Sequence, residues 1–146
     1  MKKKFVTISY LKKISGKIIV FTNGCFDILH SGHINILRFS KKKGDLLIVG
    51  LNSDNSIKKI KKKKPYFSFK ERVKILSEIE SVDYIVKMNE SNPKKIMQAI
   101  KPHFHIKGGD YKAKNLEEYD LAKKIKCKII IFKIVKKISS SKFYKN

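Results

Sequence analysis

The chain has 146 residues, of which 42% are hydrophobic, and its formal net charge at pH 7 is +23. This length and apolar fraction suit one domain with a hydrophobic core and exclude a disordered chain, and no apolar run approaches the roughly 18 residues that a membrane-spanning helix needs. The basic start lacks the apolar segment of a signal peptide, and Cys25 and Cys127 are too few for a disulfide framework, so we expect a reducing, cytoplasmic location.

The first part of the chain alternates apolar runs with helical patterns. Residues 1–16 predict a helical extension that ends at a glycine. Residues 17–22 predict a strand, because a near-continuous apolar run is typical of a strand buried on both faces. A helix over residues 33–43, a second buried strand over residues 45–51 and a short helix over residues 53–59 are expected to follow.

A lysine-rich segment, residues 58–65, predicts a charged loop before the next helix. That helix is expected over residues 68–79, since Ser68 is a good N-terminal cap and Glu71 stands three residues later, the spacing of a capping box. The run DYIVKM at residues 83–88 then predicts a third strand.

The rest of the chain continues the alternation. A helix is expected over residues 92–100, where an asparagine cap precedes a proline, and the run HFHIK at residues 103–107 predicts a fourth strand. Asn115 is expected to cap another helix, and residues 127–134 predict a fifth strand. The serine-rich segment after it predicts the start of one more helix.

Strands that alternate with helices indicate a parallel sheet between two helical layers. We therefore predict an α/β fold, a Rossmann-like three-layer domain with about five parallel strands and helices on both faces. The sequence shows no domain boundary. Residues 1–146 are interpreted as a single domain, with the core at residues 17–141 and a short tail at residues 142–146.

His30, Gly32 and His33 stand between the first predicted strand and the helix after it. Their spacing places both imidazoles on one face, and the helix N-terminus offers N–H groups and a partial positive charge. Ligands of open α/β sheets bind at the carboxyl ends of the strands. A phosphate site is therefore favoured, with capping histidines of an ordinary loop and a zinc site that adds Cys25 and Asp27 as the alternatives.

Two further segments are expected at the same edge of the sheet. Lys107, Gly108, Gly109 and Asp110 follow the fourth strand, and the two glycines either let a nucleotide base or ribose approach the backbone or form a tight turn without a ligand. A run of serines follows the fifth strand. We therefore expect loops that are distant in sequence to meet in one crevice.

Three other residues have two interpretations each. Arg72 follows the capping glutamate and either reaches a substrate phosphate or pairs with a carboxylate. His103 and His105 lie two apart on one strand and share a face, where a structural role is favoured over metal binding.

The segment FTNGCFDILHSGH resembles the HxGH signature of the small nucleotidyltransferases, the cytidylyltransferase-like superfamily. The likeness is greatest to adenylyltransferase domains that act on heptose 1-phosphate in lipopolysaccharide precursor synthesis, and it covers nearly the whole chain. KGGDY distinguishes these domains from the related glycerol-phosphate cytidylyltransferases, which usually carry a different residue pair there. The other matching motifs are NSD at residues 52–54, ER at residues 71–72 and VDYIV at residues 82–86.

The resemblance implies transfer of AMP from ATP to a sugar 1-phosphate with release of pyrophosphate. The attacking phosphate is already ionised, so catalysis consists of positioning and charge stabilisation without a general base, with Mg²⁺ on the triphosphate as the cofactor. The implied partners are ATP or CTP and a phosphorylated sugar or polyol. Small members of this family are often homodimers, and neither a membrane nor a nucleic acid is an expected partner.

The resemblance also implies a role for individual residues. The catalytic set, which holds the triphosphate and stabilises the transition state, is His30, His33 and Lys61. The nucleotide-binding set is Asn23, Gly24, Cys25, Phe26, Gly32, Lys107, Gly108, Gly109, Asp110, Ser139, Ser140 and Ser141. The acceptor-binding set is Asp27, Lys63 and Arg72, in which Asp27 anchors the loop or orients substrate and is not a base. No metal site made by the protein alone is expected.

The charge of the chain allows another class of function. A strongly basic domain is typical of nucleic-acid binding. However, only Arg38 and Arg72 of the 35 basic residues are arginines, whereas base readout and a bidentate grip on phosphate favour arginine. Enrichment in Lys, Ile and Asn instead indicates A·T-rich coding bias. The alternatives are therefore a glycerol 3-phosphate cytidylyltransferase that uses CTP and a basic nucleic-acid-binding module without catalysis.

Overall fold

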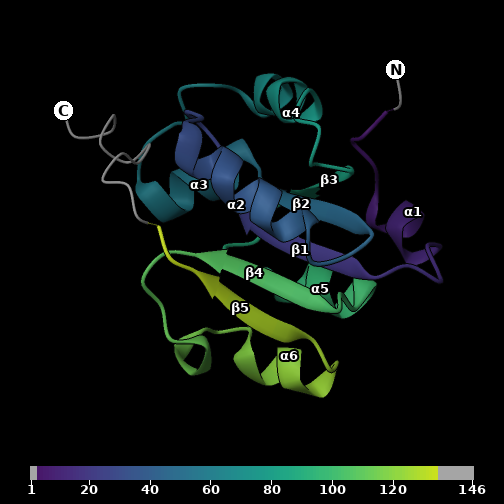
Figure 1. Ribbon diagram of the computed structural model, residues 1–146. Coiled ribbons are helices and arrows are strands. Elements are labelled where there is room, and N and C mark those ends of the chain that lie inside the picture. The colour runs from purple at the N-terminus through teal and green to yellow at the C-terminus, as the bar shows by residue number, and fades with distance from the viewer. Residues whose placement is uncertain (1–2, 135–146) are drawn as a thin grey trace.

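The computed structural model describes residues 3–134 and contains one sheet of five parallel strands (Figure 1). The strands are β1 (Ile19–Gly24), β2 (Leu46–Asn52), β3 (Tyr84–Met88), β4 (Phe104–Gly108) and β5 (Lys128–Phe132). Their order is β3-β2-β1-β4-β5. The chain first adds strands on one side of β1 and then crosses to the other side. A crevice is therefore expected where the carboxyl ends of β1 and β4 lie side by side.

Helices cover both faces of the sheet. Within residues 3–134 they are α1 (Ile8–Lys12), α2 (Ser31–Lys41), α3 (Asp54–Lys61), α4 (Phe69–Ser77), α5 (Lys94–Ile100), the 3-10 turn η1 (Ala113–Asn115) and α6 (Tyr119–Lys124). In Figure 1, α2 lies in front of the sheet and α5 lies behind it. No helix among residues 3–134 combines the length and the apolar character that crossing a membrane requires.

Alternate residues of the central strands supply the two halves of the core. Ile19 and Phe21 of β1 pack into a cluster with residues of α1, α5 and α6. Val20, between them in sequence, packs on the opposite face with residues of α2 and α4. Because both faces are buried, β1 has no polar face, which explains the continuous apolar run in its sequence. The α/β prediction of a Rossmann-like domain with helices on both faces is confirmed.

The N-terminal segment differs from the helical extension that was expected. The helix α1 covers only Ile8–Lys12, with Thr7 as its cap. Before it, Phe5 forms a parallel bridge with Ile85 at the outer edge of β3, where the N–H of Val6 donates to the carbonyl of Ile85 at 3.0 Å. The segment pairs there because the edge of β3 otherwise leaves backbone groups without partners.

Three element boundaries near the carboxyl edge also differ from prediction. The strand β1 extends two residues beyond Thr22, because Asn23 and Gly24 pair with β2. The helix α2 begins at Ser31, two residues earlier than expected, with His30 as its cap. The helix expected to begin at Asn115 is wrong at its start, since this residue ends the turn η1 and α6 begins at Tyr119.

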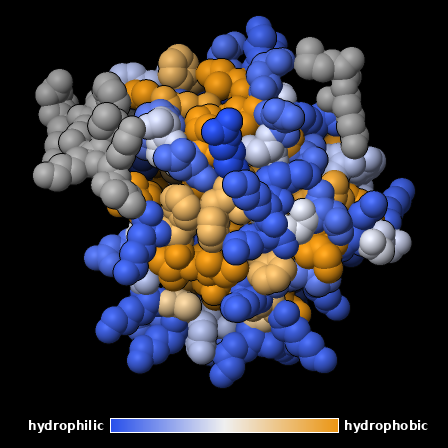
Figure 2. Space-filling view, viewed as in Figure 1, coloured by the Kyte–Doolittle hydropathy of each residue, from blue (hydrophilic) through white to orange (hydrophobic). Residues whose placement is uncertain are grey.

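Charged side chains on the surface surround areas of exposed apolar residues. Figure 2 shows hydrophilic side chains, in blue, surrounding apolar surface in the middle of the face that bears α2. Exposed large apolar residues include Ile60, Tyr66 and Phe67, which lie in or after α3. These residues adjoin the lysine-rich segment before α4.

Candidate active site

A pocket of about 200 Å³ lies at the carboxyl ends of β1 and β4, against the first turn of α2. Its walls contain residues 23–26, His30, Gly32, His33 and Gly108. Two of the three segments that were expected to meet at this edge therefore do so. The third contains Ser139, Ser140 and Ser141, which lie outside the described residues.

His30 and His33 form a reciprocal cap at the start of α2. The N–H of Gly32 donates to Nδ1 of His30 at 3.1 Å, and the N–H of His30 donates to Nδ1 of His33 at 3.2 Å. The two rings lie 4.0 Å apart between centroids. The helix begins here because the two imidazoles satisfy backbone N–H groups that have no partner within the first turn.

These contacts fix the protonation state of both imidazoles. Each Nδ1 accepts a hydrogen bond, so each ring proton resides on Nε2 in the neutral form. Burial lowers the pKa of His30, and burial together with the charges of His30 and Lys61 lowers the pKa of His33 to about 4. Within residues 3–134 neither Nε2 has a hydrogen-bond partner. Both histidines thus present a neutral Nε2–H donor rather than a base.

Gly32 allows this arrangement because a side chain would collide with the first histidine. A Cβ at this position would lie 2.8 Å from Cε1 and 2.9 Å from Nδ1 of His30. Atoms that close must move apart, so an alanine here would push the imidazole of His30 away. The glycine of the HxGH motif is therefore required by the close approach of the ring.

The turn after β1 is strained. Phe26 has φ 44°, in the left-handed region that non-glycine residues rarely adopt, and its side chain is buried against His33 at 5.4 Å between ring centroids. Such strain costs of order 1–3 kcal/mol and persists only where the surroundings impose it. Nearby, Oδ1 of Asn23 is buried without a hydrogen-bond partner within residues 3–134. Asn23 is one of the residues that line the pocket.

Two lysines act electrostatically on residues of the pocket. Burial raises the pKa of the Cys25 thiol, while the charges of Lys61, Arg72 and Lys107 act in the opposite direction. Lys61 also lowers the pKa of His33. Since such interactions fall off with distance, Lys61 and Lys107 lie near these residues of the pocket. Lys63 lies on the exposed loop that follows α3.

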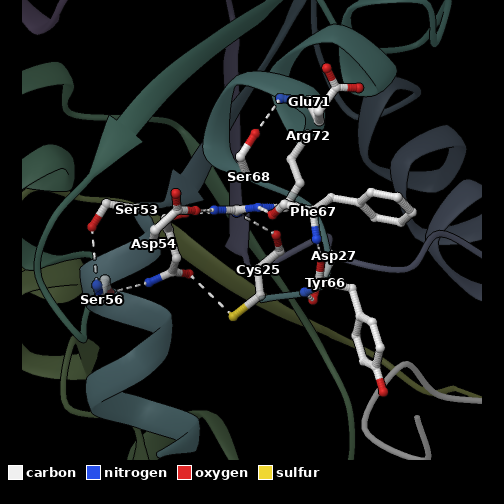
Figure 3. Close-up of polar contacts among 11 residues, drawn as sticks. Cys25, Asp27, Ser53, Asp54, Ser56, Tyr66, Phe67, Ser68, Glu71 and Arg72 are labelled. Atoms are coloured by element: carbon white, nitrogen blue, oxygen red, sulfur yellow. Dashed lines mark hydrogen bonds and ion pairs between the residues drawn. The ribbon is translucent and has the colours of Figure 1, made fainter. Parts of the chain in front are cut away.

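Asp27 is buried, and both of its carboxylate oxygens accept hydrogen bonds from backbone N–H groups. Oδ2 accepts from the N–H of Tyr66 at 2.7 Å, and Oδ1 accepts from the N–H of Phe67 at 2.9 Å (Figure 3). Of the two expectations for this residue, loop anchor and substrate-orienting group, its contacts fit the anchor. The carboxylate is also buried, so it is not placed to act as a base on a ligand.

Arg72 is the largest fully buried side chain, and its guanidinium faces protein groups. Figure 3 shows the guanidinium between the turn after β1, the start of α3 and the loop before α4. Its side chain is 0% exposed, and Nη2 donates to Oδ1 of Asp54 at 2.7 Å. The interpretation as a carboxylate partner therefore fits the structure. The expectation of contact with an acceptor phosphate does not, because burial separates the guanidinium from a ligand in the pocket.

The segment after β4 has the expected tight geometry. Gly108 lines the pocket, and Gly109 has φ 128°, a conformation open to glycine, with its N–H donating to the carbonyl of Phe132 at 3.0 Å. Lys107 lies with its Nζ 5.5 Å from the ring centroid of Tyr111. Asp110 is exposed beside this turn.

His103, which lies just before β4, and His105, within β4, both contact protein groups. Nδ1 of His103 accepts from the N–H of Ile19 at 3.0 Å. His105 is fully buried and contacts Oε1 of Glu118 at 3.0 Å and the carbonyl of Phe21 at 3.3 Å. Its hydrogen bond and charge lower the pKa of Glu118, against the effect of burial. The favoured structural role of His103 and His105 agrees with these contacts.

The residues of the pocket suit a metal ion that arrives with a ligand. Within residues 3–134, no three His, Cys, Asp or Glu side chains are placed to hold an ion together. Asp27, the carboxylate of this turn, is fully engaged with backbone N–H groups. Mg²⁺ usually keeps several waters and binds through substrate phosphates.

Sequence reasoning assigned no role to several residues at this edge, although NSD at residues 52–54 was among the matching motifs. Ile36 and Ile134 contribute apolar surface to the pocket. Asn52 and Asp54, at the end of β2 and the start of α3, contact the guanidinium of Arg72. Their position directly after a buried strand was a usable signal, since every strand of a parallel sheet ends at the same edge.

The arrangement suits the binding of a phosphorylated ligand and the stabilisation of negative charge. Two neutral Nε2–H donors, the N-terminus of α2 and nearby lysines all face anions favourably. The pocket residues that the structure describes include no free carboxylate and no histidine poised as a base. Such a site supports charge stabilisation better than proton abstraction.

Comparisons with known proteins agree with this geometry. The chain is 48% identical over 112 residues to the bifunctional protein HldE of Aliarcobacter butzleri, a match that covers 76% of this chain and 24% of the relative. It is 52% identical over 106 residues to the bifunctional protein HldE of Helicobacter pylori strain J99, with 72% of this chain and 23% of the relative covered. The chain thus spans about a quarter of the length of these relatives.

Solved structures and a family model extend the comparison. A lipopolysaccharide core biosynthesis protein from Thermoplasma volcanium superposes with a TM-score of 0.66 at 34% identity, covering 84% of this chain and 100% of that one. Pantoate-beta-alanine ligase from Francisella tularensis superposes with a TM-score of 0.72 at 16% identity, over 99% of this chain and 74% of that one, and shows the fold alone. The family model described as cytidylyltransferase-like matches residues 21–146. The chain therefore belongs to the cytidylyltransferase-like family.

Proposed function

We propose that this chain is an adenylyltransferase that transfers AMP from ATP to a sugar 1-phosphate of the heptose type and releases pyrophosphate. The observation that carries the proposal is the pair of neutral histidine Nε2–H groups at the start of α2, in a pocket at the carboxyl edge of the sheet. The resemblance of the HxGH and KGGDY segments to heptose 1-phosphate adenylyltransferase domains, and the match to HldE proteins, support this substrate class.

The reaction needs charge stabilisation and no general base. An ionised oxygen of the sugar phosphate attacks the α-phosphorus of ATP, a new P–O bond forms, and the bond to the β-phosphate oxygen breaks with release of pyrophosphate. Negative charge shifts toward the leaving oxygens in the transition state. His30 and His33 donate to these oxygens through Nε2, and the pre-set donors lose no free energy to reorientation at that moment.

The remaining assigned residues hold the substrates. Lys61 and Lys107 add positive charge beside the pocket, and Lys63 lies on the loop next to Lys61. Mg²⁺ accompanies the triphosphate as part of the substrate and neutralises part of its charge. The serines at 139–141 are assigned to the triphosphate by resemblance only, and the homodimer implied by the family also stays a prediction.

A crossed substrate screen tests this function. ATP and CTP are each combined with heptose 1-phosphate or glycerol 3-phosphate in the presence of Mg²⁺, and release of pyrophosphate is measured. The proposal predicts release only with ATP and the sugar 1-phosphate. His30→Ala and His33→Ala should each lower kcat by about 10²- to 10³-fold, as the loss of a pre-set donor does. Full turnover in both variants would contradict the assignment of the histidines.

One observation favours a second candidate, a cytidylyltransferase for an alcohol phosphate. The matching family model takes its description from cytidylyl transfer. The same screen separates the two reactions, because this candidate requires pyrophosphate release from CTP with glycerol 3-phosphate. Release in that arm alone would replace the adenylyltransferase.

A further inference from the structure

The lysine loop, which we define as residues 61–67, begins at the last residue of α3 and ends before α4. Lys62 ends α3 in a left-handed conformation, with φ 59°. Pro65 restricts the backbone in the middle of the loop. The loop is exposed over most of its length, so packing alone does not hold it in place.

Two buried charged side chains hold the far end of this loop. Both oxygens of Asp27 accept from the loop backbone, at Tyr66 and Phe67. Nε of Arg72 donates to the carbonyl of Phe67 at 3.0 Å. Phe67 is therefore bound through its N–H and its carbonyl to two different segments of the protein (Figure 3).

Arg72 connects the loop to the rest of the carboxyl edge. Nη1 donates to the carbonyls of Cys25 at 2.9 Å and Asn52 at 2.7 Å, and Nη2 donates to Asp54. The guanidinium thus joins the turn after β1, the end of β2, the start of α3 and the lysine loop. A lysine at this position has no planar fork and would not reach four acceptors in these directions.

We propose that Asp27 and Arg72 are positioning residues, which act on the reaction through the lysine loop and not by contact with substrate. The inference rests on the proposed function, because it concerns how lysines reach the substrate phosphates in that site. Asp27 lies three residues before His30, so the same turn that leads to the histidines also anchors the loop. The network fixes the distance between the histidine donors and the loop lysines before substrate arrives.

A double-mutant cycle tests this positioning. The first variant is Asp27→Asn, which keeps the shape of the side chain but turns an NH₂ group toward one backbone N–H of the loop. The second combines Lys61→Ala with Lys63→Ala. A misplacement of about 1 Å costs about 100-fold, so Asp27→Asn should lower kcat/KM on that scale. If Asp27 acts through the lysines, the lysine substitutions should cause little further loss in the Asp27→Asn background.

Two controls separate positioning from a general loss of stability. Asp83→Asn changes a carboxylate that also accepts from a backbone N–H, since Oδ2 of Asp83 accepts from the N–H of Leu47 at 2.7 Å as well as pairing with Lys41, but it lies before β3 at the other end of the sheet. It should lower Tm without changing kcat/KM at a temperature where every variant is folded. Lys64→Ala removes a charge from the same loop and should leave kcat/KM within about twofold, as exposed substitutions usually do.

Hydrogen exchange gives a readout that does not depend on turnover. In the wild type, the amides of Tyr66 and Phe67 should exchange slowly, and Asp27→Asn should speed their exchange while the amides of β1 stay protected. Multiplicative losses in the cycle, or protected Tyr66 and Phe67 amides in Asp27→Asn, would overturn the proposal. A wild type without activity, together with the predicted exchange pattern, would instead count against the proposed function alone.

Discussion

At the scale of single residues, the protonation of His33 determines what the pocket can do. Its pKa of about 4 means that the ring is neutral at pH 7 and donates from Nε2. We expect ¹H–¹⁵N NMR to show an Nε2–H tautomer that persists as pH falls to about 4. In urea-unfolded protein the same ring should titrate near its ordinary value of about 6.5. A midpoint above 6.5 in the folded protein would contradict this assignment.

The same shift predicts how stability depends on pH. Between about pH 6.5 and 4 the unfolded chain binds a proton at His33 that the folded chain does not bind. Protonation then favours the unfolded state. The contribution of His33 is therefore fully present above about pH 6.5 and is lost as pH falls, which a comparison of Tm for wild type and His33→Gln over this range should show. Equal pH dependence of the two proteins would speak against the shift.

Gly32 offers a second test at this scale. Alanine favours helix over glycine by up to about 1 kcal/mol. The contact of its Cβ with the His30 ring opposes this gain, so Gly32→Ala should leave the free energy of unfolding nearly unchanged. Its Cβ would displace the imidazole of His30, so kcat should fall by about 100-fold. Asn35→Ala, on an exposed position of α2, serves as the control and should keep kcat. Wild-type kcat in Gly32→Ala would show that the ring position is not critical.

At the scale of elements, Arg72 joins four segments at the carboxyl edge of the sheet. Its removal leaves the carbonyls of Cys25, Asn52 and Phe67 without their donor, while Asp54 is half exposed and can be hydrated. We expect Arg72→Ala to lower the free energy of unfolding by about 3 kcal/mol. Denaturant unfolding measures this loss. Arg38, the other arginine of the chain, is exposed, and Arg38→Ala should change the free energy of unfolding by less than about 0.5 kcal/mol. Equal losses in the two variants would refute the role of Arg72.

The elements that the sequence predicts well are those whose local pattern decides their structure. The strands β1 and β2 are buried on both faces, so their apolar runs are almost continuous. The helix α4 has the predicted serine cap, in which Oγ of Ser68 accepts from the N–H of Glu71 at 3.3 Å, although the structure gives no return bond from the Ser68 N–H to the Glu71 side chain within residues 3–134. In these places, local and tertiary preferences agree.

The sequence-based predictions were wrong or incomplete where a side chain makes a tertiary contact instead of a local one. Glu118 precedes α6 but makes no side-chain cap, because its carboxylate contacts buried His105 instead. A helix start without a capping side chain has no local signal, so Asn115 was the better candidate in the sequence. The partners of Arg72 could not be predicted from the sequence either, since three of them are backbone carbonyls, which every residue possesses.

The candidate site was predictable in outline for a different reason. Parallel strands end at one edge, so the HxGH segment and Gly108 had to meet there. The tautomers of His30 and His33 depend on backbone N–H groups whose directions follow only from the turn after β1. Sequence spacing therefore located the histidines but did not determine which nitrogen faces a ligand.

At the scale of the whole molecule, the net charge of +23 should assist the binding of anions. Positive charge around a pocket attracts phosphorylated substrates, and salt screens this attraction over about 10 Å at 0.1 M. We expect KM for ATP to rise between about 50 and 200 mM NaCl while kcat stays constant. A salt-independent KM, with strong salt-sensitive binding of DNA or RNA, would favour the nucleic-acid-binding alternative.

The fate of the phosphates of ATP is the most direct test of the whole account. ATP labelled at the α-phosphorus is incubated with heptose 1-phosphate, Mg²⁺ and the protein, in parallel with ATP labelled at the γ-phosphorus. The α-label should appear in a nucleotide-linked sugar and the γ-label in pyrophosphate, in equal amounts. Transfer of the γ-label to the sugar, or no transfer of the α-label to any sugar phosphate, would contradict adenylyl transfer.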